Sequence, residues 1–472
     1  MSGSGGIRVD GWGAVIWAVD VCTREATLFA AVGFLLCGID DVAVDIVYAA
    51  RRLLRTTTPA SLEDFPLADK PGRIAIFVPA WREEEVIGAM LESALGRIEH
   101  PDFRIYVGAY ANDRATIAAA ARVAARDARV RLVVGETPGP TTKGGNLNRI
   151  YRALLEDEAR EGVRVKAVVL HDAEDVVHPG ELRVFDRLVE SHWIVQLPVL
   201  PLVDRGGMIA GHYADEFAEA HTKQMVVREA LGAALPLAGV GCAIARDALD
   251  AVAAVRGDGP FDGGSLTEDY EFGLHAAGLG GRGIFARIAE APGGRPVAVR
   301  AYFPDRLDAA VRQKARWMTG IALAGWDRIG WGRAGAFGDH WMRMRDRRSP
   351  LAILLLASAY VALIGYAASR TLHALFAGHG GPGAVGGMAM VLSVNAALLV
   401  WRLVMRSAFT YATYGMRQAL LSLPRAFVAN YVALLAARRA FVQYGAMLLG
   451  AKPRWDKTDH IFPDDPDAAI RG

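Results

Sequence analysis

Three acidic side chains stand together directly after a short apolar run of the sequence: Asp172, Glu174 and Asp175. Carboxylate oxygens are hard ligands of the kind that Mg²⁺ and Mn²⁺ prefer, and such an ion can bridge a protein to the oxygens of a phosphate. The ion would then act as a Lewis acid on a leaving diphosphate. The alternative is that these residues cap a helix after a strand, since acidic side chains accept hydrogen bonds from helix N-termini. Other motifs along the chain decide between a metal site and a helix cap.

Two further groups of reactive residues follow along the chain. Glu268 and Asp269 form an acidic pair, and a carboxylate can serve as a general base when partial burial moves its pKa toward the working pH. Gln313, Arg316 and Trp317 belong to a Gln-x-x-Arg-Trp sequence. An Arg matches phosphate oxygens in a bidentate way, and the face of an indole can stack on a sugar ring. The alternatives are a solvated acidic helix start and a helix anchored by Trp and Arg at a membrane surface.

A regular alternation of strands and helices positions these residues. Short apolar runs rich in β-branched and aromatic residues predict strands over 74–78, 104–109, 131–134 and 167–170. Stretches rich in Ala and Glu predict helices between them, over 83–98, 115–128 and 146–161. This alternation predicts an α/β fold with a mainly parallel, doubly wound sheet. Farther on, the pattern predicts a strand over 193–202 and helices over 215–231 and 307–324.

Polar and turn-forming residues follow the predicted strand ends, where ligands bind in sheets of this kind. They are Pro79, Ala80 and Glu83 after the first strand, and Asn112 and Asp113 after the second. Lys143 opens the Gly-rich start of the helix that leads to the fourth strand, where a Lys and backbone N–H groups can meet a phosphate. Turns rich in such residues are common, so each of these segments is weak evidence by itself.

Membrane segments account for the high apolar content of 52%. Residues 350–369 carry no charge over a length that predicts a membrane span, and residues 385–401 predict a second. Residues 23–50 predict a further helix that either spans or lies on the surface. Residues 420–449 carry Arg438 and Arg439 near the middle, which is costly in hydrocarbon, so we expect helices lying in the cytoplasmic interface. Arginines at the span ends place those ends in the cytoplasm.

The overall composition excludes several classes of protein. Lys and Arg number 53 against 51 Asp and Glu, so the charge gives no reason to expect a nucleic acid partner. The three cysteines have no metal-ligand spacing and no paired framework, which favours a reduced cytosolic compartment for the soluble part. The first 25 residues lack the pattern of a cleaved signal peptide.

The acidic triplet, Thr-Glu-Asp and Gln-x-x-Arg-Trp, followed by membrane segments, resemble in this order the processive family-two glycosyltransferases, such as cellulose and hyaluronan synthases. The resemblance implies a Rossmann-like, GT-A type domain that binds a nucleotide sugar. It implies Asp269 as general base, with Glu268 shaping its surroundings, and a metal-binding triplet. The family form is Asp-x-Asp, whereas the third position here is Glu174, so whether Glu174 or Asp175 ligates stays open.

The same resemblance implies the substrate contacts. Arg316 would lie near the diphosphate and Trp317 near the acceptor end of a glycan, with Gln313 beside them. Residues of the first two strand ends would line the nucleoside pocket: Pro79, Ala80, Glu83, Asn112 and Asp113. Lys143 would meet the phosphates, and Mg²⁺ or Mn²⁺ would be the cofactor.

Several longer motifs resemble a narrower group, the inner-membrane glycosyltransferases related to the phage N-four adsorption protein B. They are Gly38-Ile39-Asp40-Asp41, His171 to Pro179, Arg312 to Trp317, and the tail from Trp455 to Pro463. This resemblance implies a bacterial inner-membrane protein that assembles a surface or secreted polysaccharide. Longer members carry a C-terminal cyclic-dinucleotide-binding domain, and we do not predict such a domain for this sequence. The tail resembles a gating segment across an active site, the alternative being simple packing.

We therefore expect residues 1–55 to form an N-terminal membrane helix region, 72–335 a cytoplasmic glycosyltransferase domain, 350–450 transmembrane and interfacial helices, and 451–472 a tail. The expected function is inverting transfer from a nucleoside-diphosphate sugar, UDP-linked, to a growing exopolysaccharide or surface glycan. An outer-envelope partner for secretion is compatible with this function. The alternatives are a non-catalytic membrane scaffold or phage-receptor component, and a transferase to a lipid-phosphate acceptor.

Overall fold

A computed structural model describes residues 11–54, 60–377, 386–451, 457–458 and 460–471 of the chain. The chain forms two compact units. One comprises the residues up to Ile46 together with Arg348–Met405, and the other comprises Val47–Arg347 with the chain from Arg406 onward. The predicted site residues all lie in the second unit, which is built around a β-sheet.

A seven-stranded sheet in the order β3-β2-β1-β4-β7-β5-β8 forms the centre of the second unit. Its strands are β1 (Ile74–Pro79), β2 (Phe103–Tyr110), β3 (Val130–Gly135), β4 (Ala167–Leu170), β5 (Ile194–Gln196), β7 (Cys242–Ala245) and β8 (Gly283–Phe285). The pairs that β1 forms with β2 and β4 are parallel, and so is the pair of β2 with β3. Only β7 runs antiparallel to its neighbours. The predicted α/β fold with a mainly parallel sheet is confirmed.

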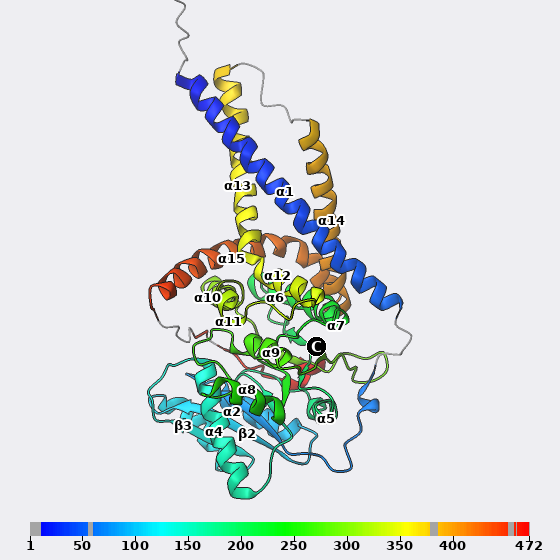
Figure 1. Ribbon diagram of the computed structural model, residues 1–472, viewed down its shortest axis with the longest axis vertical. Coiled ribbons are helices and arrows are strands. Elements are labelled where there is room, and N and C mark those ends of the chain that lie inside the picture. The colour runs from blue at the N-terminus through cyan, green and yellow to red at the C-terminus, as the bar shows by residue number, and fades with distance from the viewer. Residues whose placement is uncertain (1–10, 55–59, 378–385, 452–456, 459, 472) are drawn as a thin grey trace, which may run out of the picture. The chain divides into compact units, whose positions relative to one another are not determined.

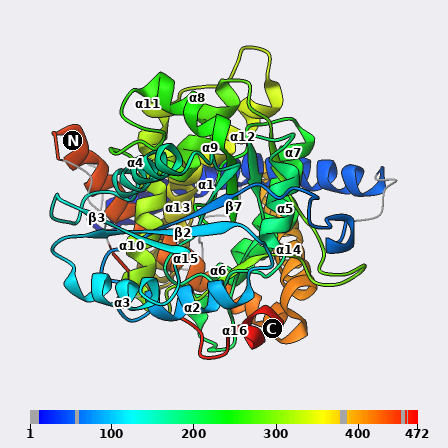
Figure 2. The same cartoon turned by 90° about the horizontal axis from the view of Figure 1, so that it is seen from below.

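Helices cover both faces of this sheet, as Figure 2 shows. On one side lie α2 (Ile87–Arg97) and α3 (Arg114–Ala124), and on the other α4 (Lys143–Glu161), α8 (Arg246–Arg256) and α9 (Glu268–Gly278). Strands β1 and β4 are buried along their whole length, because apolar side chains from both helical layers pack against them. Strands covered on both faces read as continuous apolar runs, which is why the sequence revealed them.

The four strands predicted first agree with β1 to β4 within a residue or two. The predicted strand 193–202 is in fact two strands, β5 and β6 (Val199–Pro201), and β6 pairs with β9 (Val299–Ala301) in a separate sheet. Pro198 lies between them and has no N–H to donate to a ladder. Helix α2 begins at Ile87 rather than at residue 83, because the Glu83 amide donates to Thr116 Oγ1 (2.8 Å) and residues 83–86 form a turn.

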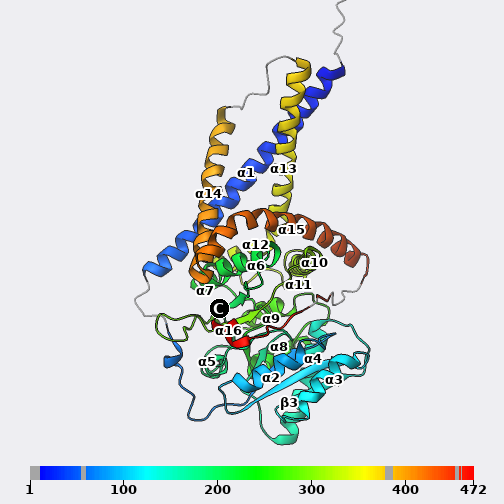
Figure 3. The ribbon, with the colours of Figure 1, turned by 180° about the vertical axis from the view of Figure 1, so that it is seen from behind.

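A second group of helices in this unit packs together apart from those that cover the sheet. It contains α6 (Met208–Glu219), α7 (Met225–Ala230), α10 (Leu307–Trp317), α11 (Gly325–Ile329), α12 (Phe337–Arg347) and α15 (Met416–Leu448). A π-helical turn follows α6 (Ala220–Gln224) and another follows α10 (Met318–Ala324), so each predicted helix there is interrupted. Figure 3 shows α15 alongside α6 and α10, and all three are in contact.

The first unit consists of the larger part of α1 (Gly11–Leu53), of α13 (Ser349–Leu372) with the π-helical turn His373–Ala377, and of α14 (Gly386–Tyr414) as far as Met405. Helix α1 runs obliquely across the other two (Figure 1). Glycines permit the close approach, since a Cβ on Gly33 would lie 2.2 Å from Leu355 and one on Gly38 2.7 Å from Leu398. Arg348 pairs with Asp40 and Asp41, each at 2.5 Å.

Four of the described helices have the length and apolar composition of a membrane span: Trp12–Leu53, Ser349–Phe376, Met388–Tyr414 and Met416–Leu448. The last of them, α15, has one face buried against the rest of the second unit. Residues along that face include Gln418, Ser422, Arg425 and Val432. Its opposite side exposes large apolar residues, among them Leu420, Phe427 and Tyr431. An amphipathic helix of this kind suits an interface better than the centre of a bilayer.

Candidate active site

Side chains from three separate segments meet at the carboxyl end of the sheet. Asp172 follows β4, Lys143 begins α4, and Asp269 lies in the first turn of α9. Lys143 Nζ lies 2.6 Å from Asp172 Oδ1. A Cβ on Gly239 would lie 2.2 Å from Asp269 Oδ2 and 3.3 Å from Lys143 Nζ, so Asp269 and Lys143 both approach this glycine, whose φ is +78°. The Lys143 ammonium therefore joins the acidic triplet to the Glu-Asp pair.

The electrostatics of the cluster follow from burial and proximity. Burial works to lower the pKa of Lys143, but the charges of Asp172, Glu268 and Asp269 outweigh it and hold that pKa well above its usual range. Burial raises the pKa of Asp269, and Lys143 opposes this rise. Burial and the neighbouring Asp269 raise the pKa of Glu268 to about 7. The cluster thus holds the Lys143 cation beside two buried carboxyl groups, Glu268 and Asp269, whose pKa values are raised.

The Gln-x-x-Arg-Trp helix, α10, closes one side of this cluster. Arg316 and Trp317 line a pocket of about 50 Å³ together with Lys143, Glu268 and Asp269. The positive charge of Arg316 opposes the burial that raises the pKa of both carboxyl groups, which places the guanidinium near them. Lys143, which pairs with Asp172, also lines this pocket, so residues of all three sequence motifs lie near one another in the second unit.

An aromatic cluster supports the indole of Trp317. Its ring centroid lies 6.1 Å from that of Tyr213 and 6.3 Å from that of Phe217. Lys314, within the same motif, places Nζ 4.8 Å from the Tyr213 ring centroid and pairs with Glu216. Gln313 Oε1 is buried and has no hydrogen-bond partner among the residues that the structure describes.

The turns after β1 and β2 are tied to each other. Asp113 Oδ2 accepts a hydrogen bond from the Arg82 amide at 2.6 Å, and Arg82 has a φ of +57°. Asn112 makes two bonds with Gly139: its Nδ2 donates to the carbonyl (2.9 Å) and its Oδ1 accepts from the amide (2.7 Å). Pro79 ends β1 and Ala80 is buried directly after it. All five predicted nucleoside-pocket residues therefore lie on adjoining turns.

The acidic triplet divides between two directions. Asp172 faces Lys143, whereas the Asp175 side chain is 2% exposed and turned inward. Asp175 Oδ2 accepts from the Asp172 amide (2.9 Å) and lies 2.9 Å from His171 Nδ1. His171 Nε2 lies 2.7 Å from Glu181 Oε1. The His171 side chain is fully buried.

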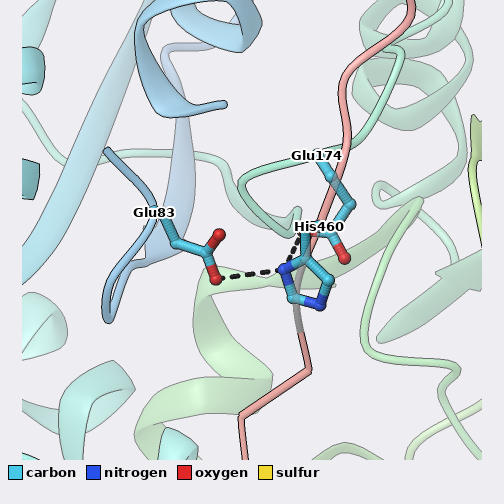
Figure 4. A group of neighbouring side chains, drawn as sticks. All are labelled: Glu83, Glu174 and His460. Atoms are coloured by element: carbon cyan, nitrogen blue, oxygen red, sulfur yellow. Dashed lines mark hydrogen bonds and ion pairs between the residues drawn. The ribbon is translucent and has the colours of Figure 1, made fainter. Parts of the chain in front are cut away.

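The third acidic residue, Glu174, meets the C-terminal segment, as Figure 4 shows. His460 Nδ1 lies 3.1 Å from Glu174 Oε2 and 3.0 Å from Glu83 Oε1, and Lys457 Nζ lies 2.7 Å from the same Glu83 oxygen. Burial raises the pKa of Glu174 to about 8 against the opposing charge of His460. Burial works to lower the pKa of His460, but Glu174 and Glu83 raise it to about 9. Trp455 and Asp459 of the same motif lie outside the described residues.

The donor set at this edge fits a divalent cation. Asp172 and Glu174 offer hard carboxylate oxygens, and Asp172 keeps 32% of its side chain exposed. One ligand atom each from Glu83, Glu174 and His460 also lies within 4.8 Å of the other two. The sequence motifs predicted the first pair. The contact made by His460 depends on residues far apart in the chain, and only the unusual content of the tail could have suggested it.

A family model described as glycosyltransferase like family 2 matches residues 71–320, which include β1, the triplet, the Glu-Asp pair and the Gln-x-x-Arg-Trp motif. The chain belongs to this glycosyltransferase family. As a glycosyltransferase it is an enzyme, and the matched region lies within the unit that carries the cluster described above. The prediction of a family-two glycosyltransferase is confirmed.

Relatives of this glycosyltransferase include two *Escherichia coli* proteins, Bacteriophage adsorption protein B of strain K12 and Bacteriophage N4 adsorption protein B of O157:H7. Each is 35% identical over 95% of this chain, which spans 64% of the length of each relative. The solved mannosyltransferase from *Pyrobaculum calidifontis*, in complex with GDP-Man and Mn²⁺, is 16% identical with a TM-score of 0.54. That likeness covers 90% of this chain and 99% of the other, and it shows that the transferase has a GT-A type fold.

Proposed function

We propose that this glycosyltransferase is metal-dependent and inverting, and that it moves a sugar from a UDP-linked donor to a growing exopolysaccharide or surface glycan. The observation that carries the proposal is that Asp269 and Arg316 line one pocket with Lys143, and that Lys143 also pairs with Asp172. A transferase needs a group to receive a proton, positive charge for a departing diphosphate, and a wall for the acceptor. The pocket offers one of each.

The chemistry follows from the side chains of the pocket. Asp269 takes the proton from the acceptor hydroxyl, whose oxygen attacks the anomeric carbon from the face opposite the diphosphate. The bond from that carbon to the diphosphate oxygen breaks, and the configuration inverts. Lys143 and Arg316 face the negative charge that builds on the departing diphosphate. Glu268 holds its place beside the base, and Trp317 with Gln313 forms the wall on which the acceptor sugar rests.

The same proposal assigns the metal and the nucleotide. Asp172 and Glu174 would hold Mg²⁺ or Mn²⁺, which supplies Lewis-acid stabilisation of the diphosphate when it is bound. The mannosyltransferase of similar fold was solved with Mn²⁺ and a nucleotide sugar, which supports this assignment. The turns that carry Pro79, Ala80, Glu83, Asn112 and Asp113 would receive the nucleoside.

We place the enzyme in a bacterial inner membrane with its catalytic domain, residues 72–335, in the cytoplasm. Residues 1–55 and 350–450 form its transmembrane and interfacial helices. Helix α15 is the interfacial one, since the chain contacts the catalytic domain on both sides of it. Tyr414, before α15, donates to the Pro201 carbonyl (2.9 Å), and Lys457, after it, pairs with Glu83 (2.7 Å). A helix with both ends on one domain does not cross a bilayer.

The C-terminal segment, residues 451–472, is a gating segment in this proposal. Its His460 and Lys457 contact Glu83 and Glu174, so the segment crosses the donor side of the pocket. Replacement of His460 by Ala should weaken donor use, seen as a higher KM for the nucleotide sugar. Sugar transfer with an unchanged KM would instead favour simple packing of the segment.

The decisive assay incubates purified membranes with a panel of radiolabelled nucleotide sugars and Mg²⁺ or Mn²⁺. We expect the sugar of one donor to be incorporated into a polymer, and we expect this incorporation to require the metal. Asp269→Asn membranes should incorporate none. Equal incorporation by the variant would contradict the assignment of Asp269. If the label is recovered only in a lipid-phosphate product, the acceptor is a lipid phosphate and not a growing polymer.

A further inference from the structure

His171 has an environment that the transfer chemistry does not explain. The ring is fully buried directly after β4, and its two nitrogens face two different carboxylates. Asp175 is 2% exposed and Glu181 has no exposed side chain at all. A buried carboxylate without a partner is costly, and a protonated imidazole presents two N–H donors that point in different directions. His171 is therefore the shared partner of two buried acids.

His171 is connected to Asp172, the predicted metal ligand, through the carboxylate of Asp175. Asp175 Oδ2 is 2.9 Å from His171 Nδ1 and accepts the Asp172 amide at the same distance. The Asp175 amide in turn donates to the Asp172 carbonyl (3.2 Å), which closes the turn. The ring thus fixes Asp175, and Asp175 fixes the backbone from which the Asp172 side chain departs.

The far end of the ring is anchored to a different element. Glu181 begins α5 (Glu181–Leu188), and its amide donates to the His178 carbonyl at 3.1 Å. The chain between is also held, because Val176 exchanges two backbone hydrogen bonds with Arg300, at 2.7 and 3.3 Å. The ring therefore spans from the acidic turn to the first turn of a helix, across a loop whose backbone is already fixed at its centre.

We propose that His171 is the positioning residue of the acidic triplet, and that Asp175 acts with it to orient Asp172 and Glu174 rather than to ligate the cation. The inference rests on the proposed function in one respect, the metal role of Asp172 and Glu174. The exposure of the side chains supports a ligand role for Asp172 and a positioning role for Asp175, since Asp172 is 32% exposed and Asp175 only 2%. Partners of this kind commonly change metal affinity about 10- to 100-fold when they are removed.

Two substitutions separate positioning from a general contribution to packing. An Asn side chain places its N–H₂ near the position of the ring Nδ1, and a Gln side chain places it near Nε2. His171→Asn should therefore keep the bond to Asp175 and lose the one to Glu181, while His171→Gln should do the reverse. Each variant loses one bond to one buried acid, so packing alone predicts similar losses in both.

The test measures Mn²⁺ binding to detergent-purified full-length protein, from the electron paramagnetic resonance signal of the free ion, with no nucleotide and no turnover. We expect His171→Gln to bind Mn²⁺ about tenfold more weakly than wild type. His171→Asn should bind more tightly than His171→Gln, at similar melting temperatures. His192→Gln, a matched change at a ring that contacts Ser191 (2.9 Å), should bind as wild type does.

The outcomes distinguish this inference from the function on which it rests. Equal Mn²⁺ affinity in wild type and His171→Gln, or weaker binding by His171→Asn than by His171→Gln, would overturn the positioning role alone. A wild type that binds no more Mn²⁺ than Asp172→Asn would overturn the metal-dependent function itself. Should His171→Gln fail to fold, Asp175→Asn decides, because its amide oxygen can still accept the Asp172 amide. If Asp175→Asn loses Mn²⁺ binding as completely as Asp172→Asn does, Asp175 is a metal ligand and the positioning role is wrong.

Discussion

Lys143 is the residue on which the charges of the pocket depend. It lies 2.6 Å from Asp172 and also interacts with Glu268 and Asp269. The sequence predicted a phosphate contact for this residue from the Gly-rich helix start around it. It gave no sign that the ammonium would stand between two acidic motifs more than ninety residues apart in the chain, because that meeting depends on how the start of α4 approaches the start of α9, where a Cβ on Gly144 would lie 3.2 Å from Glu268 Cβ.

Lys143→Met should change both the rate and its pH dependence. Burial raises the pKa of Asp269 and Lys143 lowers it, so removal of the ammonium should raise that pKa further. A general base must be ionised, and the acidic limb of the kcat/KM profile should therefore move to higher pH. Loss of an electrostatic group at a reacting centre commonly costs about 10²- to 10³-fold in kcat.

The control for this prediction is Lys70→Met, at an exposed lysine outside the pocket, which should leave the profile in place. An acidic limb that stays at its wild-type pH in Lys143→Met, or moves to lower pH, would show that Lys143 does not act on the base.

At the scale of elements, strands buried on both faces were predictable because they are continuous apolar runs, and β4 has the predicted bounds. Interruptions were harder to foresee. The break between β5 and β6 falls at Pro198, which has no N–H to donate, and helical periodicity does not register the π-helical turns after α6 and α10. The residues after β1 and β4 were predictable from topology, whereas the meeting of the C-terminal segment with Glu83 was not.

Helix α15 supplies the prediction at this scale. Arg425 is 1% exposed, and its guanidinium donates to Gln418 Oε1 at 2.6 Å and to Asp215 Oδ1 at 3.3 Å. Arg425→Met should leave the buried Asp215 without this partner and destabilise the protein by about 3–5 kcal/mol. The melting temperature in detergent measures the loss. Arg417→Met, at an exposed position of the same helix, should melt as wild type does, and equal melting of both variants would refute the packing described for α15.

At the scale of the whole molecule, the sequence predicted α/β and membrane regions from two kinds of apolar pattern. Helix α15 has the length and hydropathy of a span, but its central pair Arg438 and Arg439 predicted an interfacial helix, and one of its faces packs on the catalytic unit. Hydropathy averages over a helix and does not register which side is buried. Contacts on either side of α15 carry that information, and they come only from the fold.

Topology follows from the same contacts. In a background without Cys22 and Cys37, a cysteine at the exposed Asp464 should react with a membrane-impermeant maleimide in inside-out vesicles and not in right-side-out ones. A cysteine at Leu375, an exposed position beyond α13, should show the reverse. Labelling of both positions in right-side-out vesicles would mean that the C-terminal segment is not cytoplasmic, and α15 would then have to cross the membrane.

The most direct measurement of the central claim compares UDP binding with sugar transfer in Asp269→Asn. If this carboxylate is the base in a pocket that holds the donor through other residues, the variant should bind UDP as wild type does while transfer falls by about 10²- to 10⁴-fold. Transfer at the wild-type rate, or loss of UDP binding in parallel with transfer, would contradict the account of one pocket in which Asp269 removes the proton and Lys143 and Arg316 hold the diphosphate.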